Sequence, residues 1–136
     1  MAWGDVVRDD GDQTWQTEFR VLGDSVLADG TVRGASGSAA AARLDGDGAW
    51  ALDVVCAHSL GEDADGRAGL RFGGPTTLSE GRDRPYILVE VWDAGGAGGH
   101  GATMSTGVFD QDAGLCSKAT TSSTYDVVEG QLIVTR

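Results

Sequence analysis

Apolar and polar side chains alternate with a period of two along most of the chain. Within residues 13–22, polar side chains take one face of an extended segment, and the other face collects Trp15, Thr17, Phe19 and Val21. This alternation is typical of a half-buried β-strand. Helical periodicity is nearly absent. Only the alanine-rich residues 36–44 could be read as a helix, and Gly37 together with the lack of an apolar stripe favours a strand there too.

Turn signals divide the chain into short strands. Asp29-Gly30, residues 45–48 and residues 61–66 combine Asp with Gly, the pairing that tight turns prefer. Residues 73–85 and 94–102 are expected to be longer loops. The predicted strands are 13–22, 25–27, 31–33, 38–44, 50–58, 68–72, 86–93, 103–109, 117–128 and 131–135. Short strands at this spacing predict an all-β fold, a single-domain antiparallel β-barrel of about eight strands over residues 1–136, with a β-sandwich as the alternative.

Charge limits the partners of such a domain. The 136 residues carry 21 acidic and 10 basic side chains, a formal net charge of −11. This balance argues against nucleic acid and against an anionic membrane surface, since both are bound through Lys and Arg. No run of about 20 apolar residues could span a bilayer. Residues 1–5 have neither the basic nor the apolar part of a signal peptide, which predicts a cytoplasmic protein unless a leader has been removed.

The two cysteines leave two readings open. Cys56 and Cys116 could be buried free thiols, which the missing leader favours, or the disulfide of a secreted domain. No Cys/His cluster with the spacing of a zinc site is present, and the acidic turns lack the later bidentate Glu of a calcium loop. The sequence therefore predicts neither a metal nor a cofactor.

Familiar catalytic motifs are also missing. The glycine-rich residues 95–101 are followed by a predicted strand rather than a helix, so they do not form a phosphate loop. We expect a flexible lid there instead, with His100 inside it. No Gly-x-Ser-x-Gly elbow accompanies the serines, and His58 is expected to be a histidine at the rim of the core.

The strand at residues 86–93 has two possible orientations. Glu90 shares a face with Tyr86, Leu88 and Trp92. If that face is turned inward, burial would raise the pKa of Glu90 and make it a candidate acid or hydrogen-bonding anchor. If instead the face with Ile87, Val89 and Val91 is turned inward, Glu90 is an ordinary surface charge.

Residues 27–38 read Leu-Ala-Asp-Gly-Thr-Val-Arg-Gly-Ala-Ser-Gly-Ser. This stretch resembles the allene oxide cyclase-like barrel family, within it the small bacterial cyclases that form spirotetronate polyketides by intramolecular [4+2] cycloaddition. The likeness continues through residues 50–58 and 61–72, although the tyrosine that those cyclases tend to carry in the first of these segments is missing here. The resemblance implies an eight-stranded, often dimeric barrel that holds a hydrophobic small-molecule substrate in its lumen without a cofactor.

The resemblance also assigns roles to residues of this chain. Tyr86 or Tyr125 would donate a hydrogen bond to the substrate, with Glu90 as a further polar group and residues 95–101 as the lid. The walls that fold the substrate into a reactive shape would be Trp15, Phe19, Trp50, Leu52, Phe72, Leu88, Trp92 and Met104. The competing hypothesis is a non-catalytic barrel or sandwich that binds a small apolar ligand or a protein partner. A Cys56–Cys116 disulfide and the absence of an internal cavity would favour it.

Overall fold

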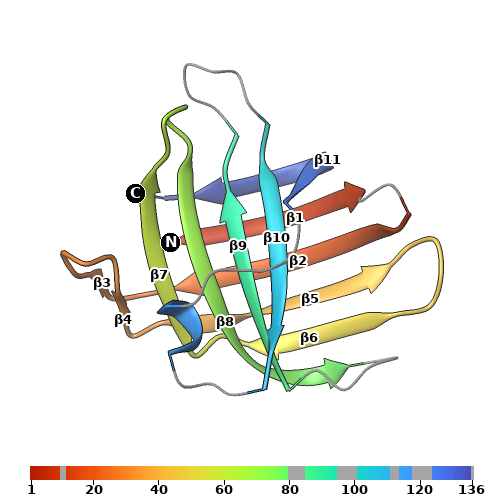
Figure 1. Cartoon of the computed structure of the whole chain (residues 1–136), viewed down its shortest axis with the longest axis horizontal. Helices are drawn as coiled ribbons and strands as arrows, with labels where there is room; N and C mark the ends of the chain where they lie inside the picture. The colour runs from red at the N-terminus through yellow and green to blue at the C-terminus, as the bar shows by residue number, and fades with distance from the viewer. Residues whose placement is uncertain (10–11, 80–84, 95–100, 111–113, 118–123, 136) are drawn as a thin grey trace.

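Eight antiparallel strands close into a barrel, as the sequence predicts (Figure 1). The structure is a computed structural model that describes residues 1–9, 12–79, 85–94, 101–110, 114–117 and 124–135. The strands follow one another around the barrel in the order β6, β5, β2, β1, β11, β10, β9, β8, and a pairing of β8 with β6 closes the ring. Their bounds are β1 Ala2–Asp9, β2 Thr14–Leu22, β5 Ser36–Arg43, β6 Ala49–Asp53, β8 Ala68–Ser79, β9 Tyr86–Trp92, β10 Thr103–Phe109 and β11 Tyr125–Val134.

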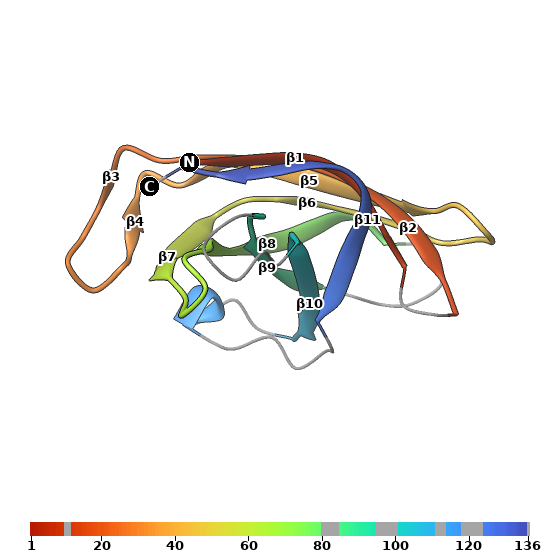
Figure 2. The ribbon, with the colours of Figure 1, turned by 90° about the horizontal axis from the view of Figure 1, so that it is seen from above.

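The barrel is flattened into two layers whose strands cross steeply. In Figure 1 the strands β8, β9 and β10 run upright, whereas β1, β2, β5, β6 and β11 lie across them, and Figure 2 shows the two layers edge on. Side chains from both layers meet between them, as in orthogonally packed sheets. The rings of Phe19 on β2 and Phe72 on β8, for example, lie 5.3 Å apart.

The predicted strand 50–58 is interrupted. β6 and β7 (Cys56–Glu62) both pair with the same edge of β8, but the alternation shifts by one residue between them. Trp50, Leu52 and Val54 are buried, and the next buried position is Ala57 rather than Cys56. One extra residue in a strand has this effect because it reverses the direction of every later side chain. Cys56 is therefore turned out of the barrel.

Strand β8 is much longer than predicted. The prediction of a loop over residues 73–85 is wrong at its start, because β8 continues to Ser79. Along its length β8 changes its pairing partner from β7 to β6. Gly73 and Gly74 allow close contact between strands rather than a turn. A Cβ on Gly73 would lie 2.6 Å from the Ile87 carbonyl oxygen, and one on Gly74 would overlap the Asp53 carbonyl oxygen.

Two further segments depart from the prediction. β1 was not predicted, because its inward positions include Gly4 and the charged Arg8, which weaken the apolar alternation. The predicted strand 117–128 is also wrong at its start, since Ser117 ends a short 3₁₀ helix, η1 (Leu115–Ser117). Residues 125–134 form a single strand, β11, in which Gly130 has a φ of +93° beside a register shift.

The hairpin predicted around Asp29-Gly30 is present. β3 (Ser25–Val26) pairs with β4 (Val32–Arg33), and Asp29 Oδ1 accepts a hydrogen bond from the backbone N–H of Thr31. The hairpin projects from the end of the barrel where both chain termini lie (Figure 2). It contacts β7 through a hydrogen bond from Ser59 N to Gly30 O. The described residues include no helix of the length and apolar character that a membrane span requires.

Candidate functional site

Six of the predicted wall residues lie together inside the barrel. They are buried members of one apolar cluster between the two layers: Trp15, Phe19, Trp50, Leu52, Phe72 and Met104. Each comes from a strand whose alternation turns it inward. Packed against one another in this way, they form the core of the barrel.

The remaining predicted residues on β9 lie outside. Ile87, Val89 and Val91 are completely or almost completely buried in the core, so the opposite face of β9 points outward. The interpretation of Glu90 as a buried lumen acid is therefore wrong, and Tyr86, Leu88 and Trp92 share its outward face. These four residues are separated from the six wall residues by the sheet itself.

Glu90 is held in a network on that outer face. Its Oε2 accepts hydrogen bonds of 3.2 Å from both Nε and Nη2 of Arg71, and its Oε1 accepts one of 3.1 Å from Trp92 Nε1. A carboxylate bound to a guanidinium and an indole N–H in this way is a structural element of the sheet surface.

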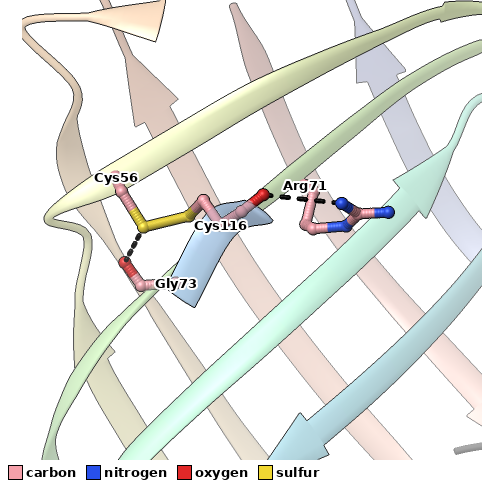
Figure 3. Close-up of a disulfide and its surroundings, with 4 residues drawn as sticks. All are labelled: Cys56, Arg71, Gly73 and Cys116. Atoms are coloured by element: carbon pink, nitrogen blue, oxygen red, sulfur yellow. Dashed lines mark hydrogen bonds between the residues drawn. A yellow bond between two sulfur atoms is a disulfide. The ribbon is translucent and has the colours of Figure 1, made fainter. Parts of the chain in front are cut away.

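Cys56 and Cys116 form a disulfide, so the prediction of free thiols is wrong (Figure 3). The shift between β6 and β7 turns Cys56 outward, toward η1, and the two Cα atoms are 6.0 Å apart. Arg71 Nη1 donates a hydrogen bond to the Cys116 carbonyl oxygen. These contacts hold Leu115 over Leu88 and create a small second core on the outside of the barrel. The sequence contains no local signal for this pairing, because the cysteines are 60 residues apart.

Tyr125 lies at one end of the barrel core, beside Arg8, a residue that the sequence did not single out. The guanidinium carbon of Arg8 is 5.0 Å from the centre of the Tyr125 ring and 5.9 Å from that of Trp15. Arg8 is only 6% exposed. Close by on β2, Thr17 is fully buried and its Oγ1 has no hydrogen-bond partner in the described part of the chain. The inward position of Thr17 was visible in the alternation, but its unpaired hydroxyl was not.

A cleft of about 470 Å³ opens at the opposite end of β1. Its floor includes the buried core side chains of Leu70 and Val134. The other lining residues belong to the chain start, the β3 segment, β7, β8 and the end of β11, namely Met1, Gly23, Asp24, Ser25, Val26, Ser59, Gly61, Glu62, Ala68, Gly69 and Thr135. Here the outer edge of β7 meets the hairpin instead of a barrel strand, so the cleft lies beside the core. Sequence reasoning did not find this cleft, because its lining comes from five separate segments.

The acidic turn 61–66 has a structural role. Burial acts to raise the pKa of Asp63, but hydrogen bonds from the backbone N–H groups of Arg67 and Asp65 and from Arg67 Nε outweigh it, so the pKa is lowered. No group of three or more His, Cys, Asp or Glu side chains among the described residues could hold a metal ion. The predicted lid, including His100, lies outside the described residues apart from Gly101.

Comparison with known proteins does not assign the chain to a group: no family model, no curated protein and no solved structure matches it.

Proposed function

We propose that the barrel binds a small, mainly apolar organic molecule in the cleft between Val26, Leu70 and Val134. The observation that carries the proposal is the lining of this cleft, where the exposed Val26 lies with the buried core residues Leu70 and Val134 inside a polar rim. A volume of about 470 Å³ lies within the range of small-molecule sites. Apolar surface at the floor would supply affinity, and the Ser25 and Ser59 hydroxyls at the rim could orient a polar group.

The disulfide supports binding rather than intracellular catalysis as the main role. Disulfides persist in oxidising compartments and are rare in the cytosol. The Cys56–Cys116 bond is one of the two features that would favour the non-catalytic hypothesis over the biosynthetic one, the other being the absence of an internal cavity. A binding module that works outside the cytoplasm is therefore the favoured form of the proposal.

A neutral fluorescent probe, N-phenyl-1-naphthylamine, tests the cleft. We expect saturable binding to the wild type and a loss of affinity of about tenfold or more in Val26→Trp, because the indole would fill the cleft. The matched control is Leu27→Trp on the same hairpin. Leu27 is exposed to a similar extent (41% against 48% for Val26) but does not line the cleft. Absence of saturable binding, or an equal effect of both substitutions, would refute the proposal.

A second candidate is the intramolecular [4+2] cyclase that the sequence resemblance implies. The observation that favours it is the inward placement of six predicted wall residues, with Arg8 over the Tyr125 ring at one end. Because these side chains pack against one another as the core, this candidate also requires the barrel to open around its substrate. Such a reaction moves no proton, so holding the two reacting ends close together would supply most of the rate enhancement.

Turnover of a linear polyene that carries a diene and a dienophile tests this candidate. Cyclisation would remove the diene absorbance and change the retention time at unchanged mass. We expect Tyr125→Phe to slow the reaction by about tenfold or more if its hydroxyl polarises the dienophile. A rate equal to that in buffer would exclude the cyclase while leaving the binding proposal standing.

A further inference from the structure

A second concave surface lies on the outer face of β1, β2 and β5, away from the cleft floor and the lumen. This groove has a volume of about 680 Å³, and its lining includes Trp3, Asp5, Glu18, Arg20 and Ser38. These residues occupy exposed positions of β1, β2 and β5. The three strands belong to the layer that lies on the far side from β8, β9 and β10 (Figure 2). The groove is therefore built on regular strands, which hold its side chains in a fixed grid.

The first notable feature of the groove is an exposed tryptophan, Trp3. Trp3 is 45% exposed and stands directly opposite Arg20 on β2, which in turn stands opposite Ser38 on β5. Leu22, 47% exposed, lies at the same end of the groove. A large indole left in solvent beside polar groups is typical of a binding surface, since folding alone would favour its burial.

The second notable feature is an unfavourable pair of charges. Asp5 and Glu18 are directly opposite each other in the β1–β2 pairing. Directly opposed side chains have Cβ atoms about 5 Å apart, and like charges in this position destabilise a sheet. Arg20 is two residues from Glu18 on the same face. Neither Arg20 nor Glu18 forms an ion pair or a side-chain hydrogen bond with another described residue. Asp5 Oδ1 accepts a hydrogen bond of 3.2 Å from Gln16 Nε2, whereas Glu18 has no such partner among the described residues. The position of Glu18 opposite Asp5 therefore costs stability without a structural benefit in the fold.

We propose that this groove binds a neutral carbohydrate chain. The apolar face of a pyranose ring packs well on an indole such as that of Trp3. The two carboxylates would accept hydrogen bonds from sugar hydroxyls, and Arg20 and Ser38 would donate to sugar oxygens. Donors and acceptors lie side by side with charges of both signs, which suits a polyhydroxylated neutral ligand better than an anion or a cation. The proposal does not depend on the apolar cleft.

Isothermal titration with cellohexaose, xylohexaose, mannohexaose and chitohexaose tests the proposal. We expect saturable binding of at least one hexasaccharide, and a loss of affinity of about tenfold or more in Trp3→Ala, because an aromatic anchor commonly dominates such a site. Trp3→Tyr should retain part of the affinity. Val128→Ala, at an exposed apolar position outside the groove, is the matched control and should bind like the wild type.

Glu18→Gln separates a ligand site from a structural role. Removing one of the opposed charges should raise the midpoint of thermal unfolding, while affinity for the hexasaccharide should fall severalfold, because a carboxylate accepts stronger hydrogen bonds than an amide. Val26→Trp should leave this binding unchanged, so failure of the apolar cleft and failure of the groove are distinguishable. Absence of binding to all four hexasaccharides, or wild-type affinity in Trp3→Ala, would overturn the proposal.

Discussion

Removal of the Cys56–Cys116 disulfide should lower the free energy of unfolding by about 4 kcal/mol. The bond closes a loop between residues 60 apart in sequence, and cross-linking a loop of that length restricts the unfolded chain by about this amount. The double variant Cys56→Ala/Cys116→Ala removes the cross-link and leaves small apolar side chains at both positions. The barrel strands themselves keep their pairings, because neither the η1 helix nor the bond contributes to the ring.

The assay is urea unfolding followed by tryptophan fluorescence, on the wild type with and without reductant and on the double variant. We expect the reduced wild type and the double variant to unfold at similar urea concentrations, well below that of the oxidised protein. The urea midpoint of the double variant should be the same with and without reductant. Denatured wild type without reductant should contain no thiol that reacts with Ellman's reagent. Two reactive thiols, or a difference below about 1 kcal/mol between oxidised and reduced protein, would refute the reasoning.

Four further substitutions, one of them a control, test the fold. Thr17→Val should raise the free energy of unfolding by about 1 kcal/mol, because it removes a buried hydroxyl without a partner; a loss of stability in urea unfolding would contradict this. Gly74→Ala should lower that free energy by about 3 kcal/mol, since its Cβ would overlap the Asp53 carbonyl, whereas Gly101→Ala, with open space around it, should be nearly neutral. Asp63 has a lowered pKa, so its contribution is present above its ordinary value of 3.8 and is lost as the pH falls through the folded value. In acid titrations followed by circular dichroism, Asp63→Asn should therefore show a shallower loss of stability below about pH 4 than the wild type.

Much of the barrel could be predicted because its signals are local. The alternation in β2 and the Asp29-Gly30 turn depend on neighbouring residues only, since strand period and turn chemistry are properties of short segments. The loop predicted to begin at Gly73 and Gly74 is wrong because local sequence was again the only basis for the prediction. A glycine that allows close strand contact looks identical in the sequence to one that makes a turn, and only the neighbouring backbones distinguish them.

The period-two pattern and the turn residues were sufficient to predict an all-β fold and most strand positions, but they left a barrel and a sandwich both open until the β6–β8 pairing closed the ring. The tertiary structure alone decided which face of β9 is turned inward, because both faces are apolar enough to be buried and only packing against the opposite layer selects one. It also decided the pairing of Cys56 with Cys116 and the opposition of Asp5 and Glu18. Contacts of this kind join residues that are distant along the chain, and strand register, rather than local sequence, sets which side chains meet.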